Sequence, residues 1–396
     1  MMTSPHVGTV LTPEERLARR KLILRDAVSL LTLFLITAVI FVLTYLLHRS
    51  FTDHEEELGE RWKARGELAL REGQPLAAIN SLRTALAYLP TRDTEIELAT
   101  ALAEAGRTTE AVAYFNTLRE TAPGDGLINL QLARLAAKQG DANLAILRYQ
   151  EALDGTWQGN GYNRRRDVRL EMANYLISRH MYTQARNQLL IAESNAPDDD
   201  SAVKIQIAGL LEQAQDLPGA LEIYQSVAAR RGAPVAAAEG AGRAAFNLGM
   251  YRVAAEYFAK EFASSQSNTL PEAAEDTDRS MMDMAAHVLL LDPSLDLPAR
   301  VRAQRILAAR NLAKARLTAC ASSAASPKLA PVLARWLQIP TSISVPKLEQ
   351  QPDLEQTVFQ LALDTETITA QVCGAPTGDD ALLLRIAQNP GAVEQE

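Results

Sequence analysis

The sequence predicts an all-α protein in which a single N-terminal transmembrane helix precedes a solenoid of helical hairpins and a helical C-terminal cap. Three observations support this prediction. An uncharged apolar stretch near the N-terminus is long enough to cross a bilayer, and the middle of the chain repeats at a near-constant spacing. Ala and Leu dominate long stretches while aromatic residues make up only 5% of the chain, which favours helices over strands.

The composition excludes some functions. Hydrophobic residues are 47% and charged residues 22% of the 396 residues, so the chain can form a core. The net charge of −8 argues against a nucleic-acid partner, because phosphate binding needs a basic stripe. Arg164-Arg165-Arg166 is the one basic cluster beyond the N-terminal segment. We interpret it as a solvated loop and helix start, with a phosphate or acidic partner as the alternative.

Residues Ala27–Leu47 contain no charged residue over roughly twenty positions, enough to span a hydrocarbon core of about 30 Å. The residues before this stretch are basic and those after it are acidic: Arg16, Arg19, Arg20, Lys21 and Arg25, then Asp53, Glu55, Glu56, Glu57 and Glu60. Basic flanks stay in the cytoplasm. We therefore expect residues 1–26 to be cytoplasmic, 27–47 to cross a bacterial inner membrane once, and the bulk to be periplasmic. No small-x-small cleavage site follows, so we expect an uncleaved anchor.

Beyond about residue 58 the chain repeats itself. Gly73, Gly106 and Gly140 recur at steps of about 33–34 residues, each five residues before an Ala and nine before a Leu or aromatic residue. The repeated small and large residues of six units are Ala78, Ala111, Ala145, Ala185, Ala220 and Ala254, then Leu82, Phe115, Tyr149, Leu189, Tyr224 and Phe258. This period predicts stacked helical hairpins.

A small residue in each first helix would let the second helix of the same hairpin approach closely. The residues in this position are Gly66, Ala99, Ala133, Ala173, Ala208 and Gly242. The Ala of the second helix is expected to fit against the small residue, and the Leu or aromatic residue one turn later to fill the space to the next unit. Pro90 and Pro123 end the first two units, since proline cannot continue a helix.

These residues resemble the tetratricopeptide repeat. The first unit matches best, with Trp62, Gly66, Gly73, Ala78, Ala85 and Pro90 at the family's signature positions. The resemblance covers about residues 59–268, in six units. It departs from the pattern where the step lengthens to about forty residues around 155–161, where His180 and Gln215 replace the turn glycine, and where Glu261 replaces a small residue.

The resemblance implies a protein-protein interaction scaffold whose first helices line a groove for a protein or peptide client. Transferring the register gives six groove residues: Lys63, Arg134, Lys138, Asn174, Arg243 and Asn247. For each, an ordinary solvated side chain is the competing interpretation. The Lys and Asn set with which the family clamps a C-terminal carboxylate is not reproduced. Envelope assembly, secretion or chaperone-like client binding would fit such a scaffold.

After about residue 264 the register is lost, and residues 264–278 are either a linker or an acidic helix start. Helical patterns follow at 280–291, 298–321, 329–337, 354–372 and 380–387. We interpret 269–396 as a helical cap or degenerate repeats, because a solenoid needs an atypical terminal unit. The alternative is that 270–396 holds the active part of an enzyme or sensor, with the repeats as a docking module.

No motif predicts catalytic, cofactor-binding or metal-binding residues. Gly240-Ala241-Gly242 matches a loose dinucleotide fingerprint, but the residues before it are helical rather than a strand. The five histidines are scattered, without metal-ligand spacing. Asp198-Asp199-Asp200 lacks the Gly and Glu of a calcium loop, and we expect it to cap the next helix.

Cys320 ends the predicted helix that starts near residue 298, and Cys373 ends the predicted helix that starts near residue 354. If these helices are adjacent, the cysteines can form a disulfide, which would persist outside the cytoplasm. The competing interpretation is that Cys320 is a small buried hydrophobic residue.

Overall fold

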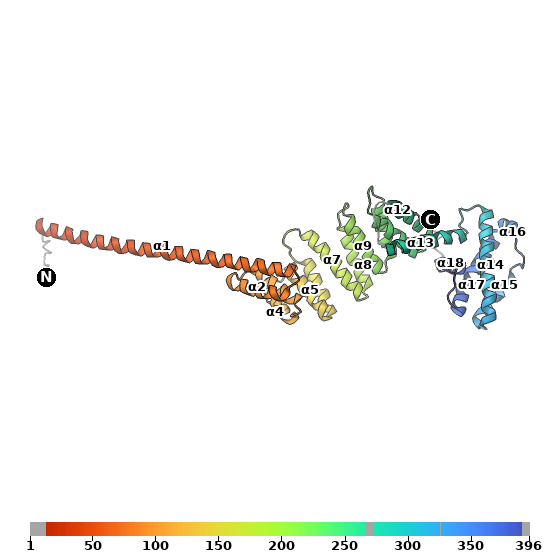
Figure 1. The fold of residues 1–396 in the computed structure, drawn as a ribbon, viewed down its shortest axis with the longest axis horizontal. Helices are drawn as coiled ribbons and strands as arrows, with labels where there is room; N and C mark the ends of the chain where they lie inside the picture. Colours follow the sequence, from red (N-terminus) through yellow and green to blue (C-terminus); the bar gives the residue numbers. More distant parts are fainter. Residues whose placement is uncertain (1–12, 266–271, 325, 390–396) are drawn as a thin grey trace, which may run out of the picture. The chain divides into compact units, whose positions relative to one another are not determined.

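The computed structural model describes residues 13–265, 272–324 and 326–389. Within these ranges the chain forms helices, one 3-10 turn and a single isolated bridge, and no strand is present. The chain divides into two compact units, residues 1–159 and 160–396, which are described separately below (Figure 1).

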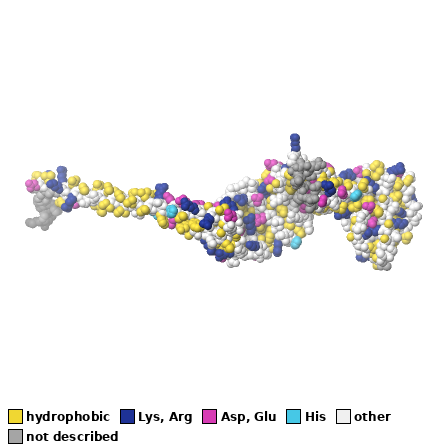
Figure 2. Space-filling model, viewed as in Figure 1, with side chains coloured by type: hydrophobic (Ala, Val, Ile, Leu, Met, Phe, Trp, Pro, Cys, Tyr) yellow, Lys and Arg dark blue, Asp and Glu magenta, His cyan; other side chains and the backbone are white. Residues whose placement is uncertain are grey.

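Helix α1 (Pro13–Arg71) contains the predicted membrane segment. It is long and apolar enough to cross a membrane, with a mean hydropathy of 2.7 in its most apolar window and none of that window buried. Figure 2 shows hydrophobic side chains covering this part of α1. The hydroxyls of Thr32, Thr37 and Thr44 donate to carbonyl oxygens about one turn back, which satisfies these polar groups within the helix.

The same helix also supplies the first helix of the first repeat. Its C-terminal part packs against α2 (Pro75–Tyr88), and Gly66 lies so close to α2 that an added Cβ would be 2.5 Å from Leu82 Cγ. Sequence analysis treated residues 27–47 and the region from 59 onward as separate elements. The structure joins them in one helix of 59 residues.

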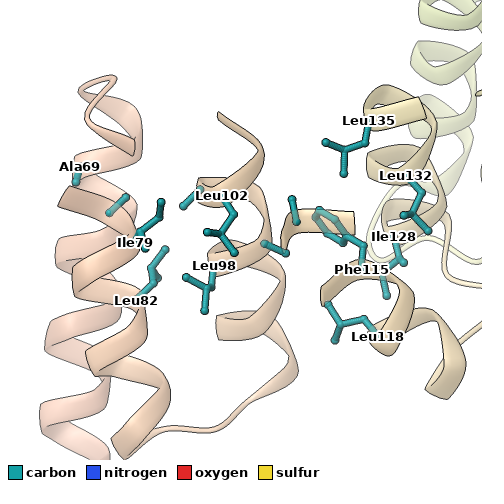
Figure 3. Packing of buried hydrophobic residues seen from close by; sticks show 14 residues of the cluster. Ala69, Ile79, Leu82, Leu98, Leu102, Phe115, Leu118, Ile128, Leu132 and Leu135 are labelled. Carbon is teal, nitrogen blue, oxygen red and sulfur yellow. The ribbon is translucent and has the colours of Figure 1, made fainter. Parts of the chain in front are cut away.

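Unit 1 continues with two further hairpins. Their helices are α3 (Arg92–Glu104), α4 (Thr108–Thr121), α5 (Gly126–Gln139) and α6 (Ala142–Asp154). Each hairpin leaves an apolar side that its neighbour covers. The labelled side chains in Figure 3, from Ala69 of α1 to Leu135 of α5, point into the spaces between successive helices. One continuous core therefore runs through these hairpins.

The lengthened step after α6 is a folded connection rather than a loose insertion. The amide of Gly126 donates to the carbonyl of Thr156 at 2.9 Å, and the amide of Thr156 donates to Gly124 at 2.8 Å. The Trp157 ring covers Gly126, where an added Cβ would be 2.3 Å from the indole, and its Nε1 donates to the Ala152 carbonyl at 2.9 Å. The connection thus closes the end of unit 1.

Unit 2 begins with three more hairpins. Their helices are α7 (Gly161–Ser178), α8 (Tyr182–Ser194), α9 (Ser201–Gln213), α10 (Leu217–Ala228), α11 (Val235–Asn247) and α12 (Tyr251–Ser265). His180 and Gln215, which replace the turn glycine, have φ of 59° and 61°, close to the 70° to 82° of Gly73, Gly106, Gly140 and Gly249. The turn geometry is therefore kept even where a side chain makes it costly.

The predicted packing residues are buried in all six hairpins. The six small first-helix residues, the six second-helix alanines and the six larger residues one turn later are all buried. The larger residue packs within its own hairpin as well as toward the next one. Phe258 lies against Gly242 of its own hairpin, whereas Tyr224 lies against Gly240 of the following hairpin.

The remaining helices of unit 2 are close to those predicted. They are α13 (Glu272–Leu291), α14 (Ala299–Ser323), the 3-10 turn η1 (Pro327–Leu329), α15 (Ala330–Gln338), α16 (Val345–Gln350), α17 (Pro352–Cys373) and α18 (Asp379–Gln388). Of the proposed linker, 272–278 belong to α13 and 266–271 lie outside the described residues. Helix α16 was not predicted.

Helices α14 and α17 pack against each other and are joined by buried ion pairs. Arg302 Nε lies 3.0 Å from Glu355 Oε2, and Arg316 Nε lies 3.2 Å from Glu366 Oε2. Burial raises the pKa of Glu366 to about 7, aided by Asp380 and opposed by Arg316. Cys320 and Cys373 lie at the ends of these two helices, at disulfide distance, with their Cα atoms 5.8 Å apart.

We expect Cys320 and Cys373 to be bridged in the mature protein. The bridge would close a loop of about fifty residues and stabilise the α14–α17 pair by a typical 2–4 kcal/mol. Thiol labelling of the denatured, unreduced protein should modify neither cysteine, whereas labelling after reduction should modify both. Two modified thiols without reduction would contradict the bridge.

We expect Ala111→Arg to unfold its hairpin. Ala111 in α4 is fully buried, so the guanidinium would be placed in the core without a partner, at a cost of several kcal/mol. Thermal melts followed by circular dichroism should show a lower midpoint or an additional early transition. Ala113→Arg is the matched control, because Ala113 is exposed on the same helix and its variant should melt like the parent. Equal melts for both variants would contradict the repeat register.

Candidate protein-binding groove

The six predicted groove residues all lie on the first helices of hairpins. Arg134, Asn174 and Arg243 directly follow the small buried residue of their helices, and Lys63 precedes its own by three residues. The first-helix face of each unit is the side of its first helices that carries these predicted groove residues, with the exposed and half-buried side chains beside them. The first helices are α1, α3 and α5 in unit 1, and α7, α9 and α11 in unit 2. Lys63, Arg134 and Lys138 lie in unit 1, whereas Asn174, Arg243 and Asn247 lie in unit 2.

In unit 1, Lys63 is paired across two helices. Its Nζ lies 3.5 Å from Oε1 of Glu97 in α3, and both side chains are mostly buried. Burial raises the pKa of Glu97 to about 7, opposed by Lys63 and aided by neighbouring Glu67. Near neutral pH this seam between α1 and α3 therefore holds a lysine beside a carboxyl group that readily takes up a proton.

Arg134 and Lys138 lie one turn apart on α5, and both are exposed. The Lys138 ammonium donates to the carbonyl of Ala103, at 3.5 Å, near the C-terminal end of α3. A helix C-terminus carries partial negative charge, which favours a cation there. These two residues form a basic, solvent-facing part of the first-helix face in unit 1.

In unit 2, Arg243 is surrounded by carboxyl groups. Its guanidinium donates to Glu239, one turn earlier on α11, and lies 3.7 Å from Oδ2 of Asp278 on α13. Burial raises the pKa of Asp278, opposed by Arg243 and aided by Glu239. Burial also raises the pKa of Glu212 on α9, which is near enough for Arg243 and Glu239 to shift it.

Tyr224 of α10 packs against Gly209 of α9 and Gly240 of α11, the helices that carry Glu212, Glu239 and Arg243. Burial raises the pKa of its hydroxyl to about 12, and the negative charge of Glu212 contributes. The ring packs against Gly240, where an added Cβ would be 2.5 Å away. Gly240 and Gly242, which matched a dinucleotide fingerprint, are thus packing residues inside α11.

Asn174 and Asn247 are exposed on α7 and α11. Asn247 lies one turn beyond Arg243 on the same helix. The structure therefore brings predicted groove residues together on α5 and on α11, while Asn174 lies on another helix of unit 2.

Sequence reasoning missed the acidic partners, Glu97, Glu212, Glu239 and Asp278. The i,i+4 spacing of Glu239 and Arg243 could have indicated one of them. Asp278 lies beyond the point where the repeat register is lost, so no repeat position could identify it.

The two charged motifs interact inside unit 2, and the predicted loop at Arg164–Arg166 is wrong because these residues lie within α7. Asp200 caps α9 by accepting from the Val203 amide at 3.1 Å, as predicted, and it lies 3.6 Å from Arg166 of the basic cluster. Lys204 pairs with Asp198 at 3.1 Å. Asp198, Asp199, Arg230 and Arg231 line a shallow pocket of about 400 Å³. In the described part of the chain, no group of three His, Cys, Asp or Glu side chains could hold a metal ion.

Each hairpin combines a buried small residue in the first helix, a buried Ala in the second, a left-handed turn residue and a large residue packed one turn later. The repeats have the tetratricopeptide fold. No protein-family model matches the sequence, and no curated protein matches it.

Solved structures resemble the chain at low identity. PilF of Pseudomonas aeruginosa is 17% identical, with 57% of this chain and 99% of that chain covered and a TM-score of 0.40. PilW, a type IV pilus biogenesis factor, is 16% identical, with 55% and 97% covered and a TM-score of 0.40. A tetratricopeptide repeat protein from Parabacteroides merdae is 14% identical, with 58% and 99% covered and a TM-score of 0.27.

Proposed function

We propose that the protein is a membrane-anchored interaction scaffold whose first-helix face binds protein or peptide clients on the periplasmic side of a bacterial inner membrane. The observation that carries this proposal is that each hairpin uses different residues for its core and for its exposed side. The small and large apolar residues are buried in the core, whereas the first helices carry charged and amide side chains that are exposed or half-buried. Residues held on helices keep a defined spacing, which suits recognition of another chain.

The membrane part of the proposal rests on α1. Its apolar side chains are exposed among the described residues, and a bilayer would cover them. A cluster of basic residues directly precedes this stretch and a cluster of acidic residues directly follows it, which favours a cytoplasmic N-terminus.

Because α1 is continuous, it fixes the distance between the membrane segment and the first repeat. About twelve residues separate Leu47 from Gly59, which at 1.5 Å per residue is about 18 Å of helix. A client on the first-helix face of unit 1 would then be held near the membrane surface.

We propose no second function for residues 270–396. Their buried carboxylates Glu355 and Glu366 are paired with arginines of α14, and such pairs join helices.

The proposed topology predicts the activity of a reporter fused after Glu396. A reporter that works only outside the cytoplasm should be active, and one that works only in the cytoplasm should be inactive. A fusion that ends at Asp26, before the apolar stretch, is the control and should give the reverse pattern. The same pattern for both fusions would contradict the orientation.

The proposed face predicts that Arg134→Glu with Lys138→Glu weakens client capture. Reversing two exposed charges on one face should repel a client that matches the parent, with an expected loss of about tenfold in affinity. Clients cross-linked to the full-length protein in membranes would be compared between parent and variant, with circular dichroism to check folding.

The matched control is Arg252→Glu with Lys260→Glu, which reverses two exposed cations on α12, a second helix. This control should keep the parent's clients. If both double variants captured clients like the parent, binding would lie elsewhere than on the first-helix face of unit 1.

A further inference from the structure

An apolar row on α1 continues beyond the membrane segment. Residues 48–58 contain only two apolar residues, Phe51 and Leu58, in an otherwise polar and charged sequence. They are seven residues apart and therefore lie on one side of the helix. The same seven-residue step leads back into the apolar stretch at Thr44 and Thr37. Phe51 is 62% exposed, and Figure 1 shows helices α2 to α5 beside the C-terminal end of α1, beyond this residue.

A second row lies beside the first and completes a heptad pattern. Steps of three and four residues alternate between the two rows, which is the spacing of the a and d positions of a parallel coiled coil. We call the eight residues of both rows the α1 seam: Leu33, Thr37, Ile40, Thr44, Leu47, Phe51, His54 and Leu58. Their side chains are exposed apart from that of Leu58, which is half-buried. The seam is thus an open face of α1 with the period of a helix-pairing surface.

The two threonines of the α1 seam suit close packing in lipid. The Thr37 hydroxyl donates to the Leu33 carbonyl and the Thr44 hydroxyl to the Ile40 carbonyl, both at 2.8 Å. These hydroxyls therefore need no partner outside α1. Short side chains let a second helix approach closely, and such packing is what favours helix association in a bilayer.

The part of the seam beyond the apolar stretch is exposed on an isolated helix. A helix of about eleven residues is marginal in water by itself. The ion pairs of this segment, Arg49 with Asp53 at 3.9 Å and Arg61 with Glu57 at 2.6 Å, are exposed and stabilise it only weakly. A helix packed on the seam would shield Phe51 from water and support this segment of α1.

We propose that α1 pairs with α1 of a second copy of this chain along the α1 seam, as a parallel coiled coil that runs from within the bilayer to Leu58. A second copy enters the membrane in the same orientation and at the same depth, so each seam residue meets its own counterpart. The seam crosses from lipid into water without a break in register, which a second copy of α1 matches over its whole length. This inference rests on the membrane anchor of the proposed function and adds that two first-helix faces are held together at the membrane.

The charges beside the seam are compatible with this pairing. In a parallel pair, the flanking g position of one helix lies opposite the e position five residues later on the other. This places Ser50 opposite Glu55 and Glu57 opposite Trp62, so no two of these carboxylates are directly opposed. The next two seam positions are Arg61 and Arg65, which repel their counterparts. The paired segment therefore ends where the repeats begin.

Photo-cross-linking of the full-length protein in its membranes tests the pairing. Phe51→p-benzoylphenylalanine keeps an aromatic ring at the seam and should give a product of twice the mass of the chain. Glu56→p-benzoylphenylalanine is the matched control, because five residues turn an α-helix by about 140° relative to Phe51 and Glu56 is also exposed. The yield at position 51 should be at least fivefold higher than at position 56.

Co-capture of two differently tagged copies gives a second measurement. Phe51→Glu places two carboxylates against each other in the seam and should lower co-capture at least tenfold. Thr52→Glu adds the same charge one residue away, outside the seam, and should leave co-capture like that of the parent. Both residues are exposed, so neither change reaches the core of the repeats.

Three results would overturn the seam while leaving the membrane anchor intact. They are equal cross-linking at positions 51 and 56, a product at position 51 that joins the chain only to a different protein, and undiminished co-capture by Phe51→Glu. A full-length chain recovered in the soluble fraction instead of the membranes would overturn the anchor of the proposed function, and the seam with it.

Discussion

The close approach of the two helices in each hairpin is the constraint on which the repeat region depends. At Gly66 and Gly242 the second helix comes so near that an added Cβ would be 2.5 Å from Leu82 or 2.8 Å from Phe258. Because the two helices are this close, the large residue fills the space between them. The apolar side of the hairpin is then complementary to the next hairpin. The charged residues of the first helices are then carried to the opposite side at a regular spacing. The spacing of the charged side chains on this face is therefore a consequence of packing on the other.

The turns show how strongly this packing acts. His180 and Gln215 adopt a left-handed conformation that glycine adopts without cost in four other hairpins. The penalty for a residue with a Cβ is about 1–2 kcal/mol. Burial of residues that follow these turns, such as Ala185 and Tyr224, outweighs that cost. Tertiary contacts therefore set the local backbone, which is why the register continues where the signature residue is lost.

Sequence reasoning found what depends on local periodicity. The small and large positions of the hairpins, and helices α14, α15, α17 and α18 to within about two residues, could be predicted from spacing and from proline and glycine positions. The start of α13 and the short helix α16 could not. The continuity of α1 could not, because the charged residues Asp53–Glu60 are equally compatible with a loop or an exposed helix. The Trp157 connection was missed because its contact with Gly126 lies outside the repeat period.

The electrostatics of the first-helix face could be predicted only in part. The register places Lys63 and Arg243 correctly on their helices, but it does not indicate which carboxyl groups meet them from neighbouring helices. Glu97 reaches Lys63 from α3, and Asp278 reaches Arg243 from a helix beyond the regular repeats. These carboxyl partners affect how Lys63 and Arg243 could bind a ligand. A lysine or arginine that is already engaged by carboxylates cannot serve as a simple anchor for an acidic client, so its free energy of binding to an anion must include the loss of the existing pair. Arg134 and Lys138 are exposed on α5, whereas Arg243 is half-buried beside carboxyl groups. The two units thus present different charges on faces built by the same packing rule.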